Sequence, residues 1–245
     1  MDLGLHDRVY IVTGGTRGLG RATAEALIVD GARVVVSSRS DDNVATAADQ
    51  LGAVGIAADN ADPAAADRLV QATLDAFGRL DGALVSVGGP PPGGVMDVTD
   101  EQWRSAFESV FLGAVRLARA VATAMTGEGA IGLVLSSSVK VPIGGLAISN
   151  GLRPGLAMVA KTLADELGPR GVRVFGLMPG LVSTDRTAQL YADEQGRQRA
   201  QGGIPLRRFG EPAEFGRVAA FALSPAASYL SGCVIPVDGG ALRTL

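Results

Sequence analysis

The sequence is poor in the side chains that form disulfides and metal sites. Its 245 residues include one cysteine, Cys233, and one histidine, His6. A single cysteine excludes an internal disulfide. His6 precedes the first expected strand, at the edge of an α/β sheet that lies away from its ligand crevice, and Cys233 opens the last expected strand, where packing is its ordinary role. We therefore assign neither residue a catalytic role and predict no metal site.

An excess of charge of one sign is also missing, as is any long apolar run. The chain carries 22 basic and 25 acidic residues, so it has neither a basic footprint for nucleic acid nor a polybasic membrane anchor. No apolar run approaches the roughly 18 residues that a membrane span needs, and the start, MDLGLHDRVYIVTGG, lacks a signal or transit pattern. We expect a cytoplasmic protein whose partners are small molecules, with no nucleic acid or membrane partner.

The chain does have a regular alternation of two patterns. Short β-branched runs occur at residues 8–13, 33–38, 53–58, 82–87, 130–135 and 172–177, with helix-period segments between them. Consecutive apolar positions within these runs are typical of strands buried on both faces. Repeated βα units with right-handed crossovers predict an α/β fold, a doubly wound parallel sheet with helices on both faces and a ligand crevice at the carboxyl ends of its strands. We expect one domain, residues 1–245.

Residues 183–210 interrupt this alternation. The segment is polar and has no strong helical or strand period, although ordered regions are expected on both sides of it. Long excursions of this kind often cover active sites. We therefore predict a substrate lid within 183–210, with a plain surface excursion as the alternative.

The first chemical motif is TGGTRGLG, residues 13–20, between an expected strand and an expected helix. Gly14, Gly18 and Gly20 would let the backbone turn tightly and approach a pyrophosphate. The helix that follows would direct free N–H groups and the positive end of its dipole toward that anion. In this setting the motif predicts a dinucleotide site in preference to an ordinary glycine-rich turn.

Three motifs, TGGTRGLG, PGLVST at 179–184 and SGCVIPVDGG at 231–240, resemble the short-chain dehydrogenase/reductase family over nearly the whole chain. The resemblance implies a Rossmann-like single domain and a homo-oligomer, a tetramer or dimer, that packs through helices at 100–126 and 149–169. It also implies a set of cofactor-binding residues from the glycine-rich turn and from the loops after the third, fourth and sixth strands: Thr13, Gly14, Thr16, Arg17, Gly18, Leu19, Gly20, Asp59, Asn60, Gly88, Pro179, Gly180 and Thr184.

The end of the second expected strand indicates which nicotinamide cofactor binds. An acidic residue there would bind ribose hydroxyls and repel a 2′-phosphate. This chain has Ser38 at that place, followed by Arg39, and Arg17 stands just before Gly18. Two guanidiniums can form charge-assisted hydrogen bonds with the phosphate, so we predict NADP(H). The alternative is that both arginines are solvated surface charges.

At the catalytic positions the chain departs from the family. Its members usually carry an Asn in the fourth long helix, a Ser after the fifth strand and a Tyr-x-x-x-Lys pair thirteen residues beyond that Ser. Val110 stands at the Asn place, and Ser136 aligns with the Ser, unless a loop of different length shifts the match to one of the next two serines, up to Ser138. Counting back from the helix sequence KTLADEL places Ser149 at the Tyr and Arg153 at the Lys.

The replaced pair changes the proton chemistry. A phenol whose pKa is lowered by a neighbouring ammonium can protonate an alkoxide, whereas a serine hydroxyl ionises far less readily. Arg153 can still hold the cofactor ribose or an anion, but its high pKa prevents it from relaying protons as a lysine does. The alternative for Arg153 is a salt bridge on the helix surface.

Four other residues are candidates for the missing functions. Lys140, just past the fifth strand, could donate a proton if burial lowered its pKa. Asn150 and Arg186 could polarise a substrate carbonyl, and Arg186 suits a carboxylate or phosphate group. Tyr191 is a phenol within the expected lid. We therefore add Lys140 to the catalytic candidates and the other three to the substrate-binding candidates.

Three functions remain open on this basis. The favoured one is an NADPH-dependent reductase of a carbonyl or related unsaturated group, whose proton comes from an unusual donor or from water, because loss of a general acid costs roughly 10²–10⁴-fold and not all activity. The second is a non-redox lyase or dehydratase that uses the serine cluster and Arg153. The third is a catalytically inactive NADP(H)-binding protein. The fold alone does not choose among them.

Overall fold

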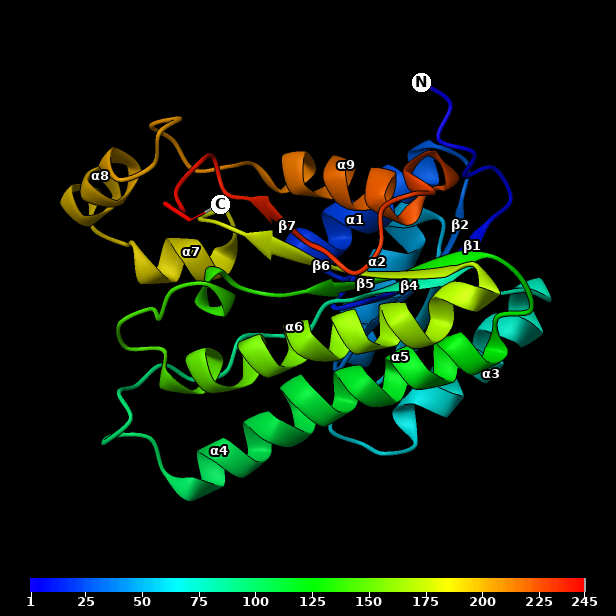
Figure 1. Ribbon diagram of the computed structural model, residues 1–245, viewed down its shortest axis with the longest axis horizontal. Helices are drawn as coiled ribbons and strands as arrows, with labels where there is room; N and C mark the ends of the chain where they lie inside the picture. Colours follow the sequence, from blue (N-terminus) through cyan, green and yellow to red (C-terminus); the bar gives the residue numbers. More distant parts are fainter. Residues whose placement is uncertain (245) are drawn as a thin grey trace.

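The computed structural model describes residues 1–244. Within them, one parallel sheet of seven strands lies between two layers of helices (Figure 1). In spatial order the strands are β3 (Val54–Ala57), β2 (Arg33–Ser38), β1 (Val9–Thr13), β4 (Gly82–Val85), β5 (Gly129–Val134), β6 (Val172–Pro179) and β7 (Val234–Val237). The chain winds outward from β1 in one direction and from β4 in the other, which confirms the predicted doubly wound, Rossmann-like α/β fold.

Helices cover both faces of the sheet, with α1 (Gly18–Val29), α2 (Asp41–Leu51) and α9 (Pro212–Leu223) on one face and α3 (Ala65–Phe77), α5 (Gly113–Ala124) and α6 (Ala147–Leu167) on the other (Figure 1). Neighbouring residues of β1 pack into the hydrophobic cores on opposite faces of the sheet. Tyr10 and Val12 belong to the core that contains Phe215 of α9, whereas Ile11 belongs to the core that contains Leu117 of α5. Two cores on one strand require apolar residues at consecutive positions, as the sequence pattern predicted.

The long helix expected at 100–126 is present in three parts. Helix α4 (Asp100–Ala106) begins with a capping box between Thr99 and Gln102, and a π-helical segment, Phe107–Leu112, joins it to α5. Segments of π-helix are rare and occur frequently at functional sites. Here the segment carries the buried Val110, which faces the ligand cleft described below.

Residues 183–210, which showed no clear period in the sequence, contain two short helices. These are α7 (Asp185–Leu190) and α8 (Glu194–Gly202), which lie beyond the carboxyl ends of β6 and β7 (Figure 1). Thr184 and Asp193 cap them by accepting hydrogen bonds from backbone N–H groups of the first turns. Neither helix contains a buried residue, so neither required the apolar repeat by which helices are found in a sequence.

Three short 3₁₀ turns, Ser137–Val139, Gly168–Arg170 and Pro225–Ala227, complete the secondary structure of the described residues. None of the helices within residues 1–244 combines the length and the apolar character needed to cross a lipid bilayer.

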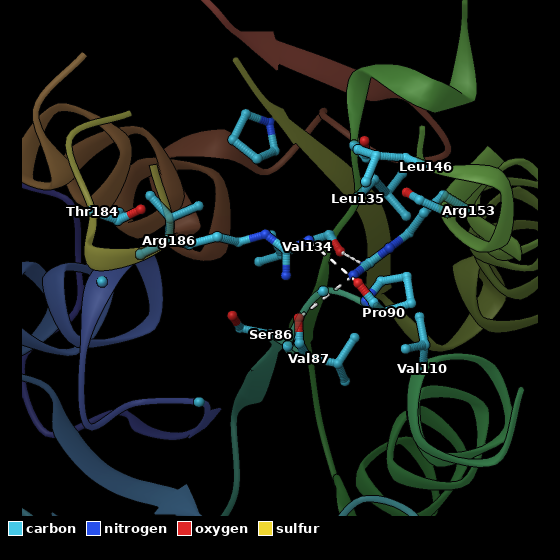
Figure 2. Close-up of a pocket in the computed structure, with 18 of the residues that line it drawn as sticks. Ser86, Val87, Pro90, Val110, Val134, Leu135, Leu146, Arg153, Thr184 and Arg186 are labelled. Carbon is cyan, nitrogen blue, oxygen red and sulfur yellow. Dashed lines mark hydrogen bonds between the residues drawn. The ribbon is translucent and has the colours of Figure 1, made fainter. Parts of the chain in front are cut away.

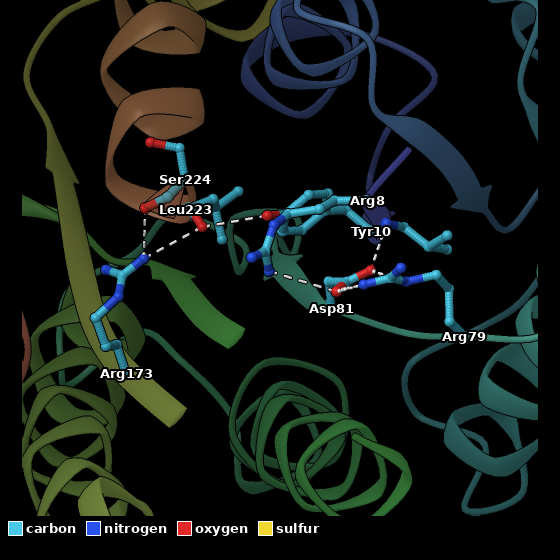
Figure 3. A network of polar contacts seen from close by, with 8 residues as sticks. Arg8, Tyr10, Arg79, Asp81, Arg173, Leu223 and Ser224 are labelled. Carbon is cyan, nitrogen blue, oxygen red and sulfur yellow. Dashed lines mark hydrogen bonds and ion pairs between the residues drawn. The ribbon is translucent and has the colours of Figure 1, made fainter. Parts of the chain in front are cut away.

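The amino ends of β1 and β4 are joined by a buried carboxylate (Figure 3). Asp81 accepts hydrogen bonds from the backbone N–H of Val9 at 2.8 Å, from Arg8 Nη1 at 3.4 Å and from both Arg79 Nε and Nη2 at 2.9 and 2.6 Å. Its side chain is only 6% exposed. Because Asp81 directly precedes β4, these bonds connect the amino ends of β1 and β4, which lie opposite the ligand cleft.

The substitution Asp81→Asn should destabilise the protein, because it removes the charge that four N–H donors from three residues share. We expect the free energy of unfolding in urea to fall by roughly 2 kcal/mol. The control is Asp165→Asn, which breaks the exposed Lys161–Asp165 pair on α6 and should cost less than about 0.5 kcal/mol. Equal effects of the two substitutions would contradict a structural role for the buried carboxylate.

Candidate functional site

A cleft of about 1390 Å³ opens at the carboxyl ends of the central strands. Its walls come from the β1–α1 turn, the ends of β2 and β3, the loops after β4, β5 and β6, and parts of α4, α6 and α7. The cleft therefore spans the point between β1 and β4 where the strand order reverses, which is where open α/β sheets bind ligands. Figure 2 shows the part of it around Ser86, Val134 and Arg153.

The glycine-rich turn forms one end of the cleft as predicted. Gly14 has a left-handed φ of +61°, and a Cβ at Gly20 would overlap the carbonyl oxygen of Gly14. The turn thus brings the amino end of α1 to the cleft, where its free N–H groups can hold an anion. Thr13 acts differently from its neighbours: its Oγ1 donates to the Ser86 carbonyl at 3.0 Å and accepts from the Ser86 N–H at 2.9 Å, which joins β1 to β4.

The end of β2 presents a polar group without a protein partner. Ser38 Oγ is buried and has no hydrogen bond among residues 1–244. Arg17 and Arg39 are exposed and line the cleft beside it, and Asp59 and Asn60 line the wall after β3. A buried hydroxyl without a partner is costly unless a ligand or solvent satisfies it, so this end suits a polar ligand group.

Two serine hydroxyls meet at the other end of the cleft. Ser138 Oγ lies 3.1 Å from Ser149 Oγ and also donates to the Ser149 carbonyl at 3.3 Å, and both residues are 5% exposed. Ser136 Oγ accepts from the Ser138 N–H at 3.2 Å and so shapes the turn after β5. Ser136 and Ser149 line the cleft, whereas Ser138 lies behind Ser149. Of the candidate serines after β5, Ser138 is thus the one that contacts Ser149.

Arg153 reaches the same end from the next turn of α6 (Figure 2). The residue is 4% exposed, and its guanidinium donates to the carbonyls of Val134, at the end of β5, and of Val87, after β4, the latter at 3.5 Å. Its Nε has no acceptor within the described part of the chain. Burial, and secondarily the like charge of Arg186, lowers the pKa of Arg153 to about 10. The side chain therefore remains charged at neutral pH.

Arg186 enters the cleft from the opposite wall (Figure 2). It extends from α7 to the loop after β4, where Nη2 donates to the Pro90 carbonyl at 3.3 Å. A Cβ at Gly89 would overlap this guanidinium, so the absence of a side chain there makes the contact possible. Arg186 thus connects the expected lid segment to the far side of the cleft. Arg153 and Arg186 thus bring two positive charges to the same region.

Comparison with known proteins identifies the family. A family model described as enoyl-(acyl carrier protein) reductase matches residues 14–241. The chain belongs to the short-chain dehydrogenase/reductase family, whose members are oxidoreductases. Dehydrogenase/reductase SDR family member 4 of Homo sapiens is 34% identical over 245 residues, which cover 96% of this chain and 88% of that protein. The 3-oxoacyl-(acyl-carrier-protein) reductase of Salmonella typhimurium is 31% identical over 95% of this chain and 96% of its own.

Solved structures of the family agree with this assignment. The L-sorbose reductase of Gluconobacter frateurii, solved in complex with NADPH and L-sorbose, superposes with a TM-score of 0.94 at 33% identity, covering 100% of both chains. The cofactor set that the resemblance implied is largely gathered in the present cleft, which is lined by Gly14, Thr16, Arg17, Gly18, Leu19, Gly20, Ser38, Arg39, Asp59, Asn60, Gly88, Arg153, Pro179, Gly180 and Thr184.

Three of the remaining candidates lie apart from the cleft or are engaged elsewhere. Asn150 uses both ends of its amide on Ile143, accepting from the backbone N–H and donating to the carbonyl, each at 2.9 Å. Lys140 is exposed and does not line the cleft. Tyr191 packs against Phe209, with ring centroids 5.7 Å apart, and lines a smaller hollow beside α7 instead of the cleft.

One wall of the cleft was not predicted from the sequence. Glu101, Ser105 and Ser109 of α4 and the following π-helical segment line it. Their spacing of four was the available signal, because residues four apart share a helix face. The apolar lining from Pro90, Leu135, Ile143 and Leu146 had no such signal. Within residues 1–244, no cluster of His, Cys, Asp or Glu is arranged to hold a metal ion.

Arg153 should contribute little to stability in the absence of ligand, because it is buried without a counter-charge and has one donor unpaired. We expect Arg153→Met to change the free energy of unfolding by less than about 1 kcal/mol, or to raise it. The control is Arg173→Met on β6. Arg173 donates to four carbonyls around the carboxyl end of α9, among them Leu223 and Ser224 (Figure 3), and its loss should cost at least about 2 kcal/mol. A larger loss for Arg153→Met in urea unfolding would contradict this distinction.

Proposed function

We propose that the chain is an NADP(H)-dependent oxidoreductase that reduces a carbonyl or related unsaturated group, at an active site in which Ser149 and Arg153 stand in place of the family's tyrosine and lysine. The observation that carries the cofactor part is the group at the end of β2. There a buried hydroxyl without a partner, Ser38 Oγ, lies beside two exposed arginines, and no acidic residue stands at the end of the strand. This arrangement suits a 2′-phosphate.

The rest of the cleft fits the remainder of a dinucleotide. Gly14, Gly18 and Gly20 allow a pyrophosphate close to the backbone at the amino end of α1. Gly88 and Thr184 line the middle of the cleft, and Arg153 can donate to ribose hydroxyls at its far end. NADPH bound in this way would supply a hydride to a substrate held beside Ser149. The L-sorbose reductase, with its bound NADPH, supports the same reading of the cofactor.

The protein's own groups would hold the substrate oxygen but protonate it poorly. When Ser138 donates to the Ser149 carbonyl, Ser149 Oγ donates to Ser138 Oγ. Ser149 must therefore rotate its hydroxyl before it can donate to a substrate. The charge of Arg153 stabilises a developing alkoxide without giving up a proton. The proton in this proposal comes from water in the cleft or through the serine pair.

We further propose that a lid covers the site and that copies of the chain associate. A lid formed by α7 is supported by the contact of Arg186 with Pro90 across the cleft. Apolar side chains for a homo-oligomer are available on the predicted helices, since Phe107 is 41% and Met158 is 67% exposed. The tetramer or dimer and the cytoplasmic location stay predictions.

Cofactor choice gives a direct test. NADPH should bind at least about tenfold, and up to about a hundredfold, more tightly than NADH, because hydrogen bonds to a charged group contribute roughly 1.5–3 kcal/mol. Arg39→Ala should remove most of this difference in titration calorimetry, while Arg119→Ala, an exposed arginine of α5 outside the cleft, should leave it unchanged. Equal affinities for the two cofactors in the wild type would refute the assignment.

The catalytic part is tested by restoring the usual pair. Ser149→Tyr with Arg153→Lys should raise the NADPH-dependent reduction of an activated ketone that bears no charge by at least about tenfold, because general acid catalysis supplies typically 10²–10⁴-fold. Each single change should do less, since a tyrosine without an adjacent ammonium keeps a pKa near 10. The measurement is the initial rate of the wild type, of each single variant and of the double variant. NADPH binding by each variant is the control for folding. A folded double variant no faster than the wild type would remove the main support for the reductase.

A further inference from the structure

Two guanidiniums converge on the substrate end of the cleft without a matching negative charge. Arg153 approaches from α6 and Arg186 from α7 (Figure 2). Their hydrogen-bond acceptors are backbone carbonyls, those of Val134, Val87 and Pro90. Arg153 is 4% exposed, and its Nε is buried with no acceptor among residues 1–244, whereas Arg186 is exposed. A buried charge in this state is costly, and a like charge across the cleft adds to the cost.

The acidic side chains of the cleft do not compensate these charges. Asp59, Glu101, Asp185 and Asp238 line it, but none forms a hydrogen bond or ion pair with either guanidinium in the described part of the chain. Two of them are engaged by backbone N–H groups: Asp59 accepts from Ala61, and Asp238 accepts from Gly240 and Leu242. Arg186 is exposed to solvent, but the buried Arg153 has no counter-charge, and a bound anion would supply one.

The position of Arg153 separates this charge from the nucleotide phosphates. The 2′-phosphate end lies at Ser38, after β2, and the pyrophosphate end lies at the β1–α1 turn. Arg153 instead contacts the ends of β4 and β5, on the other side of the switch point, next to Ser149. The segment that carries Arg186 begins near the pyrophosphate end, because Thr184 approaches within 3.6 Å of the Cβ position of Gly18, and the guanidinium extends from there to the Pro90 carbonyl after β4.

We infer that Arg153 and Arg186 together form an anion subsite that binds the carboxylate of an oxo-acid substrate. This inference rests on the proposed reductase function. A guanidinium pairs with a carboxylate through two parallel N–H···O bonds, and both arginines line the cleft. The carboxylate would then set the position of the neighbouring carbonyl group beside Ser149.

The walls around the two arginines indicate the remainder of the substrate. Next to the polar wall of α4, an apolar surface is formed by Val110, Leu135, Ile143, Leu146 and Pro90. Such a surface accepts an aliphatic or aromatic group. The substrate class is therefore an oxo acid with an apolar side chain.

Binding can be measured without turnover by using the oxidised cofactor. In the presence of saturating NADP⁺, titration calorimetry compares 4-methyl-2-oxopentanoate with its methyl ester, which keeps the carbonyl and the side chain but lacks the charge. The acid should bind the wild type at least about tenfold more tightly than the ester. Arg153→Met and Arg186→Met should each bring this ratio close to one, and Arg119→Met, outside the cleft, should leave it unchanged.

Several results would overturn the subsite. These are equal binding of acid and ester by the wild type, no binding of the acid, or an Arg186→Met variant that loses NADP⁺ affinity while its acid-to-ester ratio is unaltered. The last result would assign Arg186 to the cofactor pyrophosphate. Failure of the proposed function has a different signature, because a clear preference for the acid would persist even if NADPH were never oxidised in its presence. Conversely, reduction of uncharged ketones with an acid-to-ester ratio of one would retain the reductase and reject the subsite.

Discussion

The reversal of strand order beside β1 is the constraint on which the rest of this molecule depends. Since β1 leads outward to β2 on one side and β4 begins the outward path on the other, the loops that follow β1 and β4 move apart and leave an open crevice between them. Thr13 and Ser86 join the two strands immediately below that crevice. The amino end of α1 and the buried end of α6 then face the same space, so a nucleotide end and a substrate end arise within one cleft.

The amino ends and the carboxyl ends of the strands differ in how well their polar groups are paired. At the amino edge, buried or half-buried polar groups are well paired: Asp81 has three donor residues, and Arg173 has four carbonyls at the end of α9 (Figure 3). At the carboxyl edge, Ser38 Oγ and Arg153 Nε lack partners among the described residues. Unsatisfied groups of this kind are costly in a folded protein and concentrate at sites that bind ligands. Polar contacts thus stabilise the sheet at the amino ends of its strands, whereas polar groups at the carboxyl ends remain available for a ligand.

The chemistry that remains at the substrate end is that of a hydroxyl pair and a fixed cation. Arg153 stays charged at neutral pH even though burial lowers its pKa, so it stabilises negative charge in any step that develops it. The Ser138–Ser149 pair is a weak acid, because serine hydroxyls ionise poorly. In the proposed function, a charged substrate group would compensate poor proton transfer by positioning the reacting group.

The sequence alone determined the fold and much of the nucleotide end. Consecutive apolar positions in the strands, the glycine spacing of TGGTRGLG and the placing of Arg17 and Arg39 are local patterns, and each reflects a backbone geometry or a charge that does not depend on distant contacts. The helices α7 and α8 were not predicted, because they contain no buried residue and therefore no apolar repeat.

Only the tertiary structure decided the composition of the substrate end. The turn after β5 brings Ser138, and not Ser136, against Ser149, and the amide of Asn150 is bound to Ile143 although its sequence position suggested a substrate contact. Tyr191 and Lys140 lie outside the cleft, while Arg186 crosses it because Gly89 has no side chain. These outcomes depend on how loops from separate strands meet, and such non-local contacts leave no periodic trace in the sequence.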